Sequence, residues 1–158
     1  LRPIVFVGMP MGGIILAAYL GQLSDKRTIF AEKKDDELVI ARHKLEAGDQ
    51  VVIVEDVCNN FSTTEKALQL IFEAGATCAG IACFLNRSPI TCYETLNKSE
   101  LPNLITEEVS VISLVHKPFP QYRQDDPDVA EDIARGNVVW KPKHEWARLA
   151  AAMNAAKV

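Results

Sequence analysis

The chain has 158 residues, of which 48% are hydrophobic and 24% are charged, so disordered, collagen-like and coiled-coil classes are excluded. Its formal net charge of −4, from 17 Lys and Arg against 21 Asp and Glu, argues against nonspecific nucleic-acid binding. This length is typical of one domain, and we expect a single domain over residues 1–158 with no nucleic-acid partner.

An apolar run from Pro3 to Leu20 follows Arg2 and has the length of a signal peptide or a short membrane span. Pro10 and three glycines lie within it and would break a spanning helix. We therefore predict a strand, a loop and a helix, and no membrane partner. The four cysteines form no CxxC pair, which is typical of reduced thiols in a cytoplasmic protein.

Short runs rich in Val and Ile recur along the chain, mostly without strict alternation, as in parallel strands that are covered on both faces. We predict strands at Ile4–Val7, Thr28–Ala31, Val51–Val54, Thr77–Leu85 and Val109–Val115. Helical patterns lie between and after them, at Gly13–Gln22, Thr63–Ala74, Pro127–Ala134 and around Trp146–Met153. The first of these is apolar nearly all round, which predicts a buried helix. This alternation predicts an α/β fold with a mostly parallel central sheet flanked by helices.

Two stretches have irregular patterns. The segment from Lys33 to Gln50 is highly charged, and we interpret it as an exposed, mobile loop or hairpin. Residues 118–128 contain three prolines and form a second irregular stretch.

The most informative stretch runs from Val51 to Thr64, where a predicted buried strand ends in Glu55 and Asp56 and a polar loop leads into a helix. Ligands of open α/β sheets bind beyond the carboxyl ends of strands, and a helix N-terminus attracts phosphate. Adjacent carboxylates are suited to sugar hydroxyls or to a metal carried on phosphates. A purely structural interpretation is also open: Ser62 can be an N-cap, with Glu65 completing a capping box.

This stretch resembles the phosphoribosyl pyrophosphate (PRPP) motif of type I phosphoribosyltransferases, and the order of the other motifs resembles the orotate branch of that family. Gly8–Ile14 is similar to the family's pyrophosphate loop, and Ile29–Lys34 to the strand that opens its catalytic loop. Leu85-Asn86-Arg87 resembles a strand end that normally reads Leu-Asp-Arg.

The resemblance implies transfer of phosphoribosyl from PRPP to orotate, with Mg²⁺ carried by the diphosphate and no metal ligand set in the protein. It implies a homodimer in which the charged loop reaches the neighbouring subunit's site. The implied catalytic residues are Lys33, Lys34, Arg42, His43 and Asp56, with Lys44 on the same loop. The implied PRPP-binding residues are Met11, Gly12, Glu55, Asp56, Val57, Cys58, Asn59, Asn60, Phe61, Ser62 and Thr63, and the implied base-binding residues are Asn59 and Arg87.

Two departures from the family pattern matter. The phosphate loop, Asn59-Asn60-Phe61-Ser62-Thr63, lacks the usual glycines, so either the loop takes another path or the Phe61 ring packs aside. The sequence also starts at the first core strand, where relatives carry a hood over the base, and we expect that hood to be missing.

These departures leave two alternatives open: a PRPP- or nucleotide-binding module without turnover, and a transferase for another base. A tail with Lys117-Pro118-Phe119-Pro120 and Lys141-Pro142-Lys143 resembles that of some bacterial orotate enzymes and favours the orotate function.

Overall fold

A computed structural model describes residues 4–93, 109–123, 125–141 and 144–155. The chain divides into two compact units, Leu1–Phe119 and Pro120–Val158, which we describe separately. The expectation of a single domain stays a prediction.

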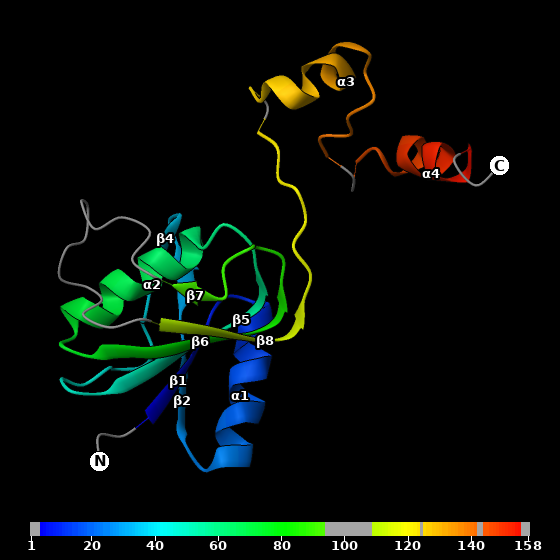
Figure 1. Ribbon diagram of the computed structural model, residues 1–158. Coiled ribbons are helices and arrows are strands. Elements are labelled where there is room, and N and C mark those ends of the chain that lie inside the picture. Colours follow the sequence, from blue (N-terminus) through cyan, green and yellow to red (C-terminus); the bar gives the residue numbers. More distant parts are fainter. Residues whose placement is uncertain (1–3, 94–108, 124, 142–143, 156–158) are drawn as a thin grey trace. The chain divides into compact units, whose positions relative to one another are not determined.

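The first unit is built on a six-stranded sheet of order β2-β1-β5-β6-β8-β7 (Figure 1). All neighbouring pairs are parallel except β7 with β8, which confirms the predicted, mostly parallel α/β fold. The strands are β1 (Ile4–Gly8), β2 (Arg27–Phe30), β5 (Gln50–Cys58), β6 (Thr77–Asn86), β7 (Cys92–Tyr93) and β8 (Val109–His116).

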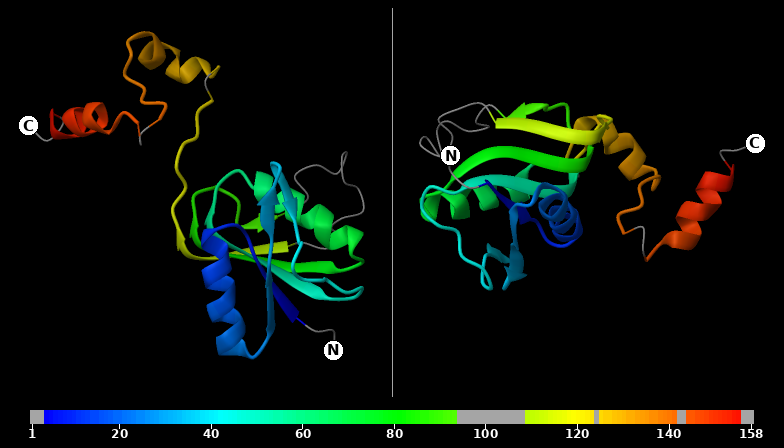
Figure 2. Two further views of the ribbon diagram at one scale, coloured as in Figure 1. Left: turned by 180° about the vertical axis from the view of Figure 1, so that it is seen from behind. Right: turned by 90° about the horizontal axis from the view of Figure 1, so that it is seen from below.

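A separate hairpin of β3 (Glu32–Lys34) and β4 (Glu37–Val39) continues from the end of β2 (Figure 2). Asp35 and Asp36 form its turn with φ of 50° and 64°, a left-handed conformation that Asp tolerates better than most residues. The predicted charged hairpin is therefore present. It is also anchored, because Leu38 and Leu45 are buried in the core.

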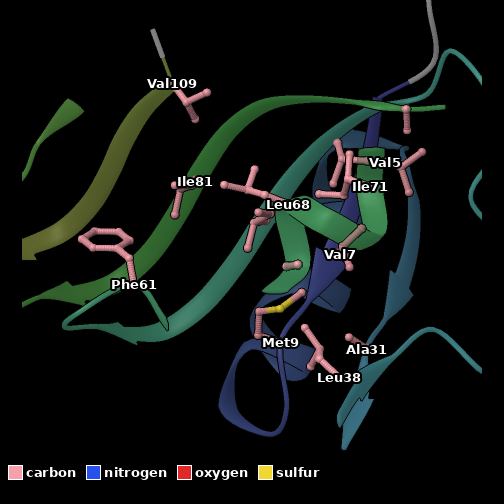
Figure 3. Close-up of a cluster of buried hydrophobic side chains, with 14 of the residues drawn as sticks. Val5, Val7, Met9, Ala31, Leu38, Phe61, Leu68, Ile71, Ile81 and Val109 are labelled. Atoms are coloured by element: carbon pink, nitrogen blue, oxygen red, sulfur yellow. The ribbon is translucent and has the colours of Figure 1, made fainter. Parts of the chain in front are cut away.

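Helices α1 (Gly12–Ser24) and α2 (Ser62–Glu73) pack on opposite faces of the sheet (Figure 1). The main core lies under α2, where Leu68 and Ile71 pack against Val5, Val7 and Ile81 of the strands (Figure 3). Each of the two helices starts at the carboxyl end of the strand before it. Both helix N-termini therefore lie at the same edge of the sheet as the ends of β1 and β5.

The expectation that the first helix is buried all round is wrong. Only Gly13, Ala17 and Gly21 of α1 are buried, a stripe of small residues that lets the helix approach the sheet closely. Tyr19 and Leu23 on the outer side are 62% and 84% exposed. Within the described residues, no helix combines the length and hydropathy needed to cross a bilayer.

The second unit contains a 3₁₀ turn at Pro127–Val129, α3 (Ala130–Ala134) and α4 (Trp146–Ala155). Asp126 caps the turn by accepting a hydrogen bond from the amide of Asp128 (3.0 Å). These helices agree with the two that the sequence pattern predicts in this region.

Candidate functional site

The acidic pair lies at the carboxyl end of β5, and its two members have different environments. Glu55 is buried and Asp56 is exposed. Burial raises the pKa of Glu55 to about 7, and the neighbouring charges of Asp56 and Cys83 act in the same direction. The Asp56 carboxylate accepts a hydrogen bond from the amide of Val57 (2.8 Å). One acid is therefore close to its protonation midpoint at neutral pH, while the other faces solvent.

A glycine loop approaches this pair from the α1 side. The amide of Met9 donates to the carbonyl of Val54 (2.9 Å), which ties the loop to β5, and the peptide between Pro10 and Met11 is cis. A Cβ atom on Gly12 would lie 2.1 Å from Oδ2 of Asp56. A Cβ atom on Gly13 would lie 2.1 Å from the carbonyl oxygen of Val54. The N-terminus of α1 reaches the acidic pair only because these two residues have no side chain.

A second loop approaches the pair from the α2 side and contains no glycine. Asn60 accepts hydrogen bonds from the amide and the hydroxyl of Ser62 (3.2 and 2.9 Å). Phe61 adopts φ 57° and is the N-cap residue of α2, and its ring is 3% exposed within the core (Figure 3). The Phe61 ring therefore packs aside, as one of the two expectations for this loop required. That the loop amides converge on a phosphate stays a prediction.

The capping box predicted for this helix is wrong. Ser62 is the first helical residue. The N-cap is Phe61, whose side chain forms no capping hydrogen bond. The amide of Glu65 donates to the carbonyl of Phe61 instead. The amide of Ser62 donates a hydrogen bond to the Asn60 carboxamide, whereas the first amides of a helix otherwise lack a partner within the helix. Asn60 could have been identified from the sequence, because Asn side chains commonly form such turns with the backbone two residues on.

An open cleft of about 240 Å³ lies between the acidic pair and the start of α2. Every predicted PRPP-binding residue from Glu55 to Thr63 lines it, together with Pro10 and Thr64. Cys58 is buried there, and a hydrogen bond with Cys83 together with burial raises the pKa of its thiol, which stays neutral. The cleft thus combines a helix N-terminus, hydroxyl groups and two carboxylates, which suits a ligand with both a phosphate and a sugar.

The predicted loop cations lie in different places. Lys33 on β3 is close enough to Glu55 for its charge to oppose the rise in the pKa of that carboxyl. The backbone of Lys34 is opposite that of Glu37 in the β3–β4 hairpin. The guanidinium of Arg42 forms an ion pair with Glu32 (3.1 Å).

His43 contacts the ring of Phe30 edge-on, with centroids 4.6 Å apart, and its Nε2 atom is buried without a hydrogen-bond partner. Of the predicted catalytic cations, Lys33 acts on Glu55 through its charge, while Arg42 contacts Glu32 and His43 contacts Phe30.

The predicted base-binding residues lie on adjacent segments. The amide of Arg87 donates to the carbonyl of Cys58 (2.9 Å), so the residue after β6 is joined to the cleft wall. Asn86 is fully buried and its carboxamide oxygen accepts from the amide and hydroxyl of Ser88, which fixes the loop that follows. Asn86 therefore has a structural role here, and the side chain at this position points into the loop rather than into the cleft.

Comparison with known proteins supports the resemblance. No family model matches the chain. Over 79 residues the chain is 33% identical to an orotate phosphoribosyltransferase of Chlorobium phaeobacteroides, and it is 34% identical to that of Chlorobaculum parvum. Each match covers 49% of this chain and 41% of the relative, so the similarity spans less than half of those proteins.

Solved structures extend the comparison of the fold. A purine phosphoribosyltransferase from Pyrococcus horikoshii aligns with a TM-score of 0.52 and 22% identity, over 77% of this chain and 82% of that one. The adenine phosphoribosyltransferase of Trypanosoma brucei aligns with a TM-score of 0.58 and 14% identity, over 86% of this chain and 69% of that one. It was solved with AMP, pyrophosphate and ribose-5-phosphate. The chain therefore has the type I phosphoribosyltransferase fold, and about half of its sequence is similar to that of orotate phosphoribosyltransferases.

Proposed function

We propose that this protein transfers the phosphoribosyl group of PRPP to orotate, giving orotidine 5′-monophosphate and pyrophosphate. The observation that supports this best is the position of Glu55 and Asp56, which lie between the N-termini of α1 and α2 at the rim of one cleft. Two anion-attracting helix ends on either side of two hydrogen-bond acceptors match a sugar that carries an anion at each end.

The roles follow from this placement. Glu55 and Asp56 accept hydrogen bonds from the 2- and 3-hydroxyls of the ribose. The amide and hydroxyl of Thr63 at the start of α2 bind the 5-phosphate, while Asn60, which accepts hydrogen bonds from the amide and hydroxyl of Ser62, holds the loop in shape. A carboxylate that accepts such hydrogen bonds contributes about 1.5–3 kcal/mol each.

The diphosphate lies on the other side of the acidic pair. Backbone groups of Met11 and Gly12 bind it, and Lys33 supplies positive charge from the hairpin. Mg²⁺ would be carried by the diphosphate, where it would neutralise part of the charge of the leaving group and would need few ligands from the protein. Departure of pyrophosphate creates positive charge on the ribose and negative charge on the leaving group, so stabilisation of the latter lowers the barrier.

The choice of orotate rests on the sequence matches, which are to orotate enzymes, whereas the structural matches to adenine and purine enzymes concern the fold. The test is an ultraviolet assay of orotate consumption with PRPP and Mg²⁺. Glu55→Gln with Asp56→Asn should weaken PRPP binding about tenfold or more while the protein stays folded. Asp25→Asn with Glu73→Gln removes the same charge from two exposed positions and should leave binding unchanged.

Two results would contradict the proposal in different ways. Consumption of adenine but not orotate would mean that the base is wrong. Binding of PRPP in calorimetry without turnover on any base would favour the alternative of a binding module, to which the glycine-free phosphate loop lends support.

We further propose that the active form is a homodimer in which Arg42, His43 and Lys44, within the segment from Lys33 to Gln50, complete the neighbouring site, while Lys33 serves the site of its own chain. Mixed dimers of an Arg42→Ala/Lys44→Ala chain with an Asp56→Asn chain should regain one working site if both parents are inactive. Verified mixed dimers without activity would show that each chain works alone.

A further inference from the structure

The register of the sheet places three residues side by side beyond the cleft. Cys58 of β5 pairs with Asn86 of β6, and Asn86 pairs with His116 of β8. The residues that directly follow β5, β6 and β8 are therefore Asn59, Arg87 and Lys117. Neighbouring strands lie about 4.8 Å apart, so these residues form a row along the carboxyl edge of the sheet. The first two were predicted to bind the base, and the third was not assigned to any site.

Backbone hydrogen bonds hold the row together. The amide of Arg87 donates to the carbonyl of Cys58 (2.9 Å), and the amide of Lys117 donates to the carbonyl of Asn86 (2.9 Å). The amide of Phe119 then donates to the carbonyl of Arg87 (3.0 Å). The segment after β8 is thus bound to the segment after β6, which is itself bound to the cleft wall.

The side chains of two residues of the row, Arg87 and Lys117, meet at one aromatic ring. The guanidinium carbon of Arg87 lies 5.1 Å from the centroid of the Phe119 ring, and the ammonium of Lys117 lies 5.4 Å from it. Cations at this distance are attracted by the ring face. None of the ion pairs found among the described residues includes Arg87 or Lys117. The ring therefore holds together two positive charges that no described carboxylate neutralises.

We propose that Lys117 is a second cation of the base subsite, positioned with Arg87 by Phe119, and that the two select a base that carries a carboxylate. This inference rests on the proposed function and identifies what sets its choice of base. A guanidinium offers paired donors that match a carboxylate, and an ammonium adds a point charge. A neutral purine or an uncharged pyrimidine presents no negative group to such a pair.

The test compares Lys117→Gln with Lys26→Gln in the full chain. Lys26 is exposed and directly precedes β2, so it lies at the amino ends of the strands, away from the cleft. We expect Lys117→Gln to raise the KM for orotate about tenfold, as for loss of one charged hydrogen bond, with PRPP affinity unchanged. We expect Lys26→Gln to change neither. The orotate KM of the parent protein should rise with salt more steeply than that of Lys117→Gln, because one charge contact is already missing in the variant.

Phe119 is a positioning residue and needs its own readout. Phe119→Leu keeps apolar bulk but removes the ring face, so the orotate KM should rise with little change in kcat. Phe119→Tyr keeps the face and should restore the parent value.

The outcomes separate this inference from the proposed function. Turnover of orotate with the same KM in Lys117→Gln overturns the inference and leaves the function intact. Orotate binding in calorimetry that depends on Lys117, without turnover, supports the inference and rejects the function. A loss of PRPP affinity in Lys117→Gln, or no orotate binding by the parent protein with PRPP present, overturns the inference, since the cations would then serve a phosphate or no base at all.

Discussion

The two loops that border the acidic pair reach similar positions by opposite means. The loop before α1, together with the first turn of that helix, depends on the absence of side chains, because a Cβ atom at Gly12 or Gly13 would overlap Asp56 or Val54. The loop before α2 has no glycine and depends on side chains: Asn60 holds the backbone by hydrogen bonds, and the buried ring of Phe61 fixes a residue with positive φ.

This difference shows that a helix N-terminus can be directed at an anion site in two ways. Glycine removes a steric obstacle but adds no attachment to the core. A buried aromatic side chain attaches the loop to the core, and this offsets the roughly 1–2 kcal/mol that a left-handed backbone costs. The second loop should therefore be the more sensitive to truncation of a side chain, and the first to addition of one.

The largest expected effect is on the second loop. Phe61→Ala removes a ring that is 3% exposed and should lower the free energy of unfolding by about 3–5 kcal/mol. Phe61→Leu keeps most of the apolar volume at the same φ and should cost much less. Thermal denaturation of both variants measures the difference. Equal melting temperatures for Phe61→Ala and the parent protein would mean that the ring does not anchor the loop.

An intermediate effect is expected in the first loop. Gly13→Ala places a Cβ atom 2.1 Å from a backbone oxygen of β5, and the forced displacement should cost about 1–3 kcal/mol. Gly80→Ala is the matched control, because the nearest atom to its added Cβ lies 3.8 Å away. Chemical denaturation compares the two. A Gly13→Ala protein as stable as Gly80→Ala would show that the approach of α1 is not tight.

The smallest expected effect concerns the acid between the loops. Glu55 has a pKa of about 7, so its ionised fraction, and with it the affinity for ribose hydroxyls, should increase up to about tenfold from about pH 6 to about pH 8. Glu55→Gln should show only the pH dependence that PRPP itself contributes. Calorimetric titration of both proteins measures this, and parallel pH profiles would contradict it.

Ionisation of Glu55 has the opposite effect on stability: it favours ligand binding but disfavours the folded state. The unfolded chain releases this proton near the ordinary value of 4.5, whereas the folded protein keeps it to about pH 7. The folded state therefore binds more protons between these values, and this contribution to the free energy of unfolding falls as pH rises through that window. Glu55→Gln should make the fall in stability shallower.

Much of the fold could be predicted because hydrophobic periodicity reports local structure. The strand predicted at Ile4–Val7 is Ile4–Gly8, and the helix predicted at Thr63–Ala74 is Ser62–Glu73. The burial of α1 could not be predicted in this way. Composition shows that the helix is apolar, but its small residues Gly13, Ala17 and Gly21 face the sheet, whereas Ile15, Tyr19 and Leu23 are exposed.

The candidate site likewise contains features that local sequence predicts and features that it does not. The acidic pair and the phosphate loop are contiguous in sequence, so a motif identifies them and the cleft brings them together. The contact of Lys117 and Arg87 with one ring depends on the register between β6 and β8, which are separate in the sequence, and no local pattern indicates it. The contact of His43 with Phe30 likewise arises only when the hairpin folds back.

The small-residue stripe of α1 makes the cleft sensitive to changes far from it. Gly21 lies eight residues after Gly13, or about 12 Å along the helix axis, and a Cβ atom there would meet the Thr28 hydroxyl at 1.8 Å. A side chain at Gly21 would push this end of α1 away from the sheet. Because the helix moves as a rigid body, its N-terminus beside Asp56 would tilt as well. Ligand binding would then restrict which residues are tolerated at Gly21, although Gly21 contacts no ligand.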